Sequence, residues 1–173
     1  MEDFLEILKY ILPSGVVFAT AYFLLKAFLD NENRKKMLEL KMANQTISIP
    51  VRLQAYERII LLLERISPGS LVLRVTQPAM TAFQLQTALI ESIRDEFEHN
   101  LAQQIYLSSN AWELAKNAKE ETIKLVNIAA SKLNESATAV DLGSVIFELS
   151  ARTEKLPVTT AIEYIKKEVR QLF

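Results

Sequence analysis

The sequence contains one long run without a charged residue, from Tyr10 to Leu25, which lies between Lys9 and Lys26. As a helix, about sixteen residues at 1.5 Å each are shorter than the ~30 Å hydrocarbon core of a bilayer. The flanking lysines can extend the run, because their methylene groups stay in the apolar region while their ammonium groups reach the interfaces. The sequence therefore predicts an N-terminal transmembrane helix within residues 1–30.

Two alternatives compete with this interpretation. Ala19-Thr20-Ala21 resembles a signal-peptide cleavage site, but the apolar run continues beyond it and the residues before the run are acidic. A buried helix of a soluble protein is the second alternative, because a run of this length lies near the boundary between the two classes. We prefer the transmembrane interpretation.

Basic residues near a membrane segment are retained on its cytoplasmic side. Lys9 alone precedes the run, whereas Lys26, Arg34, Lys35 and Lys36 follow it. This asymmetry predicts an N-terminus outside and a cytoplasmic chain from residue 31 onward. These five basic residues are the predicted membrane-interface residues, with lipid headgroups as their partners.

The part after the predicted anchor is almost neutral. The chain has 20 basic and 21 acidic residues, and two basic and four acidic ones lie in residues 1–30, which leaves 18 and 17. A nucleic-acid surface needs a basic excess, so we expect no nucleic-acid partner. The absence of cysteine agrees with a reducing compartment.

Helices are expected throughout the rest of the chain, because it has only three glycines and its prolines stand at a few joints. We divide it into a juxtamembrane helix with an extended connector at residues 31–49 and a helical domain at residues 50–173. The connector is placed at residues 44–50, where polar and apolar residues alternate before Pro50. The expected fold is all-α: a transmembrane helix that continues into an irregular bundle of about five helices.

The expected helices of the domain follow from apolar spacing and caps. The longest begins at Thr81, which forms a capping box with Gln84. Its predicted apolar face consists of Phe83, Ile90, Ile93, Phe97, Leu101 and Ile105. Asn110 is the predicted cap of the next helix, and two shorter helices follow at residues 138–152 and 160–172. Residues 71–75 fit either a strand or a helical turn, and we favour the helix.

Catalytic signatures are scarce. Glu96 and His99 have the Glu-x-x-His spacing of di-iron ligands, but such sites need the motif on two helices and His99 is the only histidine. The glycine-rich phosphate loops are also absent. We therefore expect a protein without enzymatic activity, metal or cofactor. The alternative is a small-molecule sensor or enzyme that uses a pocket between helices near His99, together with Glu96 and Trp112.

Six residues are candidates for partner binding: Gly15, Ala19, Arg52, Arg58, Arg65 and Trp112. The first two are small enough to admit a neighbouring helix. The three arginines alternate with glutamates around an apolar helix, where they either form ion pairs or recognise a partner's charges. Trp112 is a packing anchor or a ligand platform.

Several stretches resemble an uncharacterised family of membrane-anchored proteins of Bacteroidetes bacteria. They are residues 53–58 (LQAYER), 62–66 (LLERI), 96–101 (EFEHNL), 111–121 (AWELAKNAKEE) and 166–173 (KKEVRQLF). The resemblance implies a single-pass protein of the bacterial inner membrane and carries no assigned activity. Together these observations predict a scaffold or accessory subunit of a membrane protein assembly. Its expected partners are other membrane proteins or further copies of itself.

Overall fold

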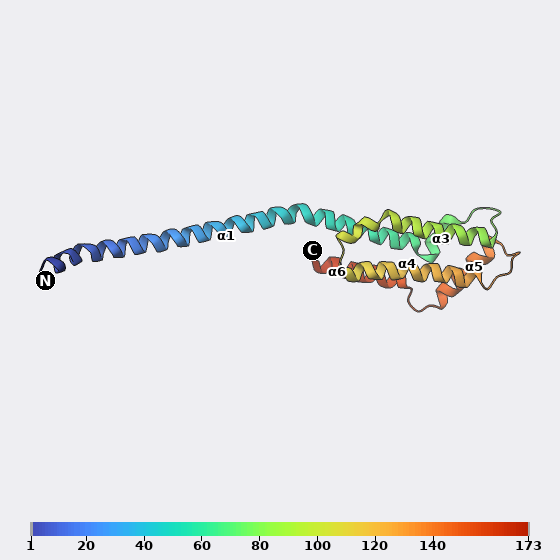
Figure 1. Ribbon diagram of the computed structural model, residues 1–173. Helices are drawn as coiled ribbons and strands as arrows, with labels where there is room; N and C mark the ends of the chain where they lie inside the picture. Colours follow the sequence, from blue (N-terminus) through green and yellow to red (C-terminus); the bar gives the residue numbers. More distant parts are fainter. Residues whose placement is uncertain (1, 173) are drawn as a thin grey trace. The chain divides into compact units, whose positions relative to one another are not determined.

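The computed structural model describes the backbone of residues 2–172 and the side chains of residues 13–40, 42 and 48–172. Within these residues the protein is all-α, as predicted, and has no β-strand (Figure 1). The chain divides into two compact units, Met1–Ile49 and Pro50–Phe173.

The first unit is part of helix α1, which runs from Glu2 to Ile66. The helix expected for residues 31–43 is confirmed, but the extended connector at residues 44–50 is wrong, because α1 continues through it. A helix satisfies the backbone hydrogen bonds of these residues internally, and the alternation at residues 46–49 covers only four residues.

The prediction of a transmembrane helix in residues 1–30 is also wrong. Over the part of the chain that the structure describes, no helix combines the length and the apolar character needed to cross a membrane. Residues 10–12 of the uncharged run lie outside the residues whose side chains the structure describes. The outside N-terminus and the membrane-interface role of Lys26, Arg34, Lys35 and Lys36 stay predictions, and the side chain of Lys9 lies outside the described residues.

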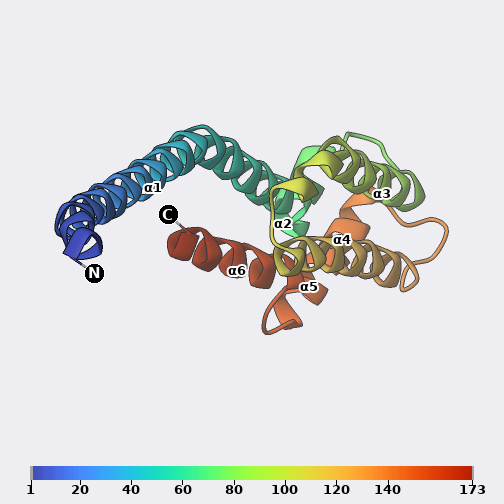
Figure 2. The same cartoon turned by 60° about the vertical axis from the view of Figure 1, so that its left-hand side comes forward.

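The second unit is a helical bundle built around α4 (Ser109–Ala130), which packs against α3 (Ala82–His99), α5 (Ala139–Arg152) and α6 (Pro157–Leu172) (Figure 1 and Figure 2). The short α2 (Pro68–Val75) packs against α3 and α5, which confirms the helical interpretation of residues 71–75. A 3-10 helix, η1 (Leu101–Ile105), follows α3. The last turns of α1 also belong to this unit.

The core is formed by one apolar face of each helix. Residues 50–66 of α1 bury Tyr56, Ile59, Leu62, Leu63 and Ile66. The face of α4 consists largely of small residues, and Ala111, Ala115, Ala118 and Ala129 are completely buried there. Alanine lets neighbouring helices approach closely, which explains how α4 contacts three of them.

The predicted face of α3 is only partly correct. Ile93 and Phe97 are buried, but Phe83 is 75% exposed, and Leu85 and Leu89 take the expected buried positions near the helix start. Leu101 and Ile105 do not belong to α3, because that helix ends at His99.

Two helix starts lie side by side and have similar sequences, Thr-Ala-Phe-Gln-Leu at residues 81–85 and Thr-Ala-Val-Asp-Leu at residues 138–142. The Thr81–Gln84 capping box is confirmed, and Thr138 forms an equivalent box with Asp141. An antiparallel bridge joins Thr81 to Thr138. The cap predicted at Asn110 is instead Ser108, whose hydroxyl oxygen accepts a hydrogen bond from the backbone N–H of Ala111 at 3.1 Å.

Candidate functional site

The most unusual surface of the protein is an apolar segment of α1, residues 16–29. Its nine large apolar side chains are each between 54% and 75% exposed: Val16, Val17, Phe18, Tyr22, Phe23, Leu24, Leu25, Phe28 and Leu29. Positions 16–18 and 22–25 are consecutive, and successive residues of a helix are rotated by about 100°. The exposed apolar side chains therefore occur on several sides of the helix.

This surface is large enough for a stable interface. At roughly 100 Å² for each exposed side chain, a value below the 150–250 Å² of a whole aromatic residue, the nine contribute about 900 Å². Stable protein complexes bury about 800 Å² on each partner, and contiguous apolar patches beyond a few hundred Å² mark interaction sites. The apolar segment is therefore the strongest candidate binding surface among the described residues.

The two small residues predicted to bind a partner lie in or next to this segment. Ala19 is exposed, and a Cβ atom added to Gly15 would meet no other atom within 4 Å. Both positions are therefore open to a neighbouring helix. The surrounding large side chains are not among the predicted partner-binding residues, because the predicted transmembrane helix assigns them to lipid.

The other four candidates lie in the bundle, and three of them have contacts within the chain. The Nε of Arg52 donates a hydrogen bond to the backbone oxygen of Tyr106 at 3.4 Å, and Arg65 forms an ion pair with Glu96 at 2.8 Å. Arg58 is exposed. Trp112 is 9% exposed and packs on Phe97, with 5.1 Å between the ring centroids. This packing and the ion pair of Arg65 join separate helices of the bundle.

The structure does not bring His99, Glu96 and Trp112 into a common pocket. His99 is exposed, and its Nδ1 lies 2.6 Å from the backbone oxygen of Asp95. The carboxylate of Glu96 is paired with Arg65, and Trp112 is largely buried against Phe97. Within the described residues, no group of three or more His, Cys, Asp or Glu side chains is arranged to hold a metal ion.

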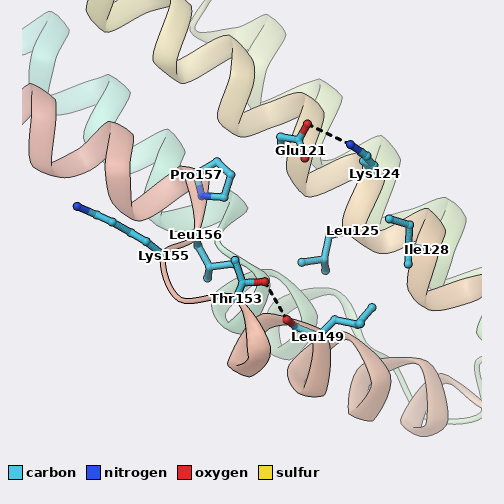
Figure 3. A pocket seen from close by; sticks show the side chains of 9 residues that line it. All are labelled: Glu121, Lys124, Leu125, Ile128, Leu149, Thr153, Lys155, Leu156 and Pro157. Atoms are coloured by element: carbon cyan, nitrogen blue, oxygen red, sulfur yellow. Dashed lines mark hydrogen bonds and ion pairs between the residues drawn. The ribbon is translucent and has the colours of Figure 1, made fainter.

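A pocket of about 360 Å³ lies instead between α4 and the α5–α6 connection (Figure 3). Leu125, Leu149 and Leu156 form its apolar centre. At its edge, Glu121 and Lys124 form an ion pair at 3.5 Å. The hydroxyl of Thr153 donates to the backbone oxygen of Leu149 at 3.0 Å.

The charged groups of this pocket are engaged with the protein itself. Figure 3 shows Lys155 pointing away from Leu125, and its ammonium group pairs with Glu163. The arrangement suits an apolar occupant and contains no nucleophile with an adjacent base. The pocket depends on the path of the α5–α6 connection, which had no sequence signal.

One polar cluster joins three helices of the bundle. The hydroxyl of Tyr56 in α1 donates to Oε1 of Glu168 in α6 at 2.5 Å, and the Ser108 hydroxyl donates to Oε2 at 2.7 Å. Burial and the neighbouring Glu168 carboxylate raise the pKa of Tyr56. Tyr56 itself is 1% exposed. The cluster therefore holds its phenol in the neutral form and fastens α1 to α6.

The chain is thus an all-α protein in which a largely exposed apolar helical segment precedes a compact helical bundle. It belongs to the DUF7935 family, a family of unknown function that matches residues 2–172. This match confirms the predicted membership of an uncharacterised family. No curated protein and no solved structure matches the chain.

Proposed function

We propose that this protein is a non-enzymatic scaffold or accessory subunit of a larger protein assembly. The apolar segment of α1 binds helices of other subunits, and the bundle at residues 50–172 is the folded body of the subunit. The observation that carries the proposal is the exposure of nine large apolar side chains on one helix. Burying such a side chain is worth about 1.5–3 kcal/mol, so the segment gains most from a partner that covers it.

The packing of the bundle supports a role in binding rather than in catalysis. Among the described residues, the buried side-chain nitrogen and oxygen atoms all have hydrogen-bond partners. Polar side chains such as those of Tyr56 and Glu168 form hydrogen bonds that connect helices to one another. The alternative of a sensor or enzyme at His99 gains no support, because the pocket in Figure 3 does not include that residue.

Co-purification of the full chain from its native cells tests the proposal. We expect the wild type to retain other proteins in stoichiometric amounts and the triple variant Phe18→Gln/Phe23→Gln/Phe28→Gln to lose them. Phe83→Gln is the matched control, because Phe83 is 75% exposed, as is Phe18, but lies in the bundle. A triple variant that retains the same proteins as the wild type would refute the role of the segment.

A further inference from the structure

We infer that the apolar segment associates with the same segment of further copies of this chain, in a parallel and in-register bundle of more than two helices. This inference rests on the proposed function and names one of its partners. Residues 17–38 of α1 carry it, through their spacing, polar residues and charges.

One stripe of residues along α1 has a regular spacing. Its positions are separated alternately by four and three residues: Val17, Ala21, Leu24, Phe28, Asn31, Lys35 and Leu38. This is the heptad spacing with which helices pack side by side as a coiled coil. The four large apolar members are between 60% and 69% exposed, so the described chain leaves the stripe uncovered.

The polar residues of the stripe bear on whether the helices of neighbouring copies run parallel or antiparallel. Asn31 and Lys35 interrupt the apolar stripe, and polar residues among the packed positions of a coiled coil help to specify its register. In a parallel, in-register bundle each Asn31 meets Asn31 of the neighbouring copy, so the amides can bind one another. In an antiparallel arrangement Asn31 would generally meet a different residue of the neighbouring helix. Asn31 therefore favours parallel chains.

The charges agree with this arrangement. Arg34 and Glu39 occupy the two positions that flank the stripe, five residues apart, where parallel helices form ion pairs between chains. Arg34 of one copy therefore faces Glu39 of the next. Residues 30–39 contain three acidic and three basic residues, so this stretch is neutral in each copy.

The width of the apolar surface indicates more than two chains. Phe18 and Leu25 follow the stripe on one side, at the position that becomes buried when a helix faces a bundle core rather than a single partner. Both are more than 60% exposed. Tyr22, Phe23 and Leu29 lie farther round the helix and stay available for the other subunits of the proposed assembly.

Disulfide crosslinking tests the register directly, because the chain contains no cysteine. Leu24→Cys places one thiol in the stripe, and Asn33→Cys places one on the opposite side of the helix as a matched control. We expect oxidation of the full-length Leu24→Cys protein to give covalent dimers at least ten times faster than the control. Light scattering of the untreated wild type should give a mass of at least three times 19.7 kDa.

A wild type with the mass of one chain, or equal crosslinking at both positions, would overturn the inference. So would flotation with phosphatidylcholine vesicles as uncrosslinked single chains, because a lipid surface would then be the occupant. The two proposals fail separately. A single chain that still co-purifies other proteins overturns self-association and leaves the scaffold role standing.

Discussion

The hydroxyl of Tyr56 offers a direct measure of how firmly α1 is joined to the bundle. Tyr56→Phe removes its hydrogen bond to Glu168 and keeps the ring that fills the core. Hydrogen bonds to charged groups are worth about 1.5–3 kcal/mol. Ser108 still donates to the other oxygen of Glu168, which is half-buried and can bind water. We therefore expect a loss of about 1.5–2 kcal/mol in the free energy of unfolding.

The pH dependence of this loss has a defined sign. Burial first, and then the bond and charge of Glu168, raise the pKa of Tyr56 above its ordinary value of about 10. A raised pKa means that the folded protein holds the phenolic proton more tightly than the unfolded chain does. The stabilisation is complete below about pH 10 and is lost as the pH rises through the folded pKa. The difference between wild type and Tyr56→Phe should therefore shrink above pH 10.

Urea unfolding of the full chain, followed by circular dichroism at several pH values, measures both effects. Tyr164→Phe is the control, because Tyr164 is a half-buried tyrosine of α6 whose hydroxyl has no hydrogen-bond partner within the described residues. We expect the control to change the free energy of unfolding by less than about 0.5 kcal/mol. Equal losses in the two variants would show that the Tyr56–Glu168 bond contributes nothing.

Three further substitutions test the bundle by urea unfolding. Thr138→Ala removes the N-cap of α5 and should cost about 0.5–2 kcal/mol, whereas no loss would mean that the cap is dispensable. The backbone N–H of Thr138 lowers the pKa of Asp141, so its stabilisation is present above about pH 4 and disappears as the pH falls through the folded pKa. Asp141→Asn should therefore be less stable than wild type at pH 7 and equal to it in acid, and a constant difference would contradict this. Leu89→Ala, at a completely buried position, should cost about 2–5 kcal/mol, while the same change at the exposed Phe83 should cost little.

The face of α3 shows where sequence periodicity reaches its limit. Residues 83, 90, 93 and 97 have helical spacing, and so do residues 85, 89, 93 and 97. Both series include the two residues that are buried near the helix end, so spacing alone cannot decide between them. The choice is made by tertiary structure: the bridge at Thr81 fixes the helix start and leaves Leu85 inside.

The sequence predicted where the candidate binding surface lies along the chain, but it predicted a membrane span there instead of a surface for protein partners. Composition identified residues 10–25 as the stretch that needs an apolar environment, and the structure exposes the large side chains of residues 16–29. The step from an apolar stretch to a transmembrane span is contradicted, because no helix of the described residues is long and apolar enough to cross a membrane. The pocket of Figure 3 was not predictable, because it forms from residues of α4 and a connection far away in the sequence.

The bridge between Thr81 and Thr138 has a consequence for hydrogen exchange. The first N–H of a helix has no partner within that helix and usually exchanges quickly. Here the amide of Ala82 donates to the carbonyl of Ala137, and the amide of Ala139 donates to the carbonyl of Met80, each at 3.0 Å. Neither amide can be released by fraying of its own helix alone, because the other chain segment holds it. We expect both amides to exchange at the same slow rate, which reports the separation of α3 from α5.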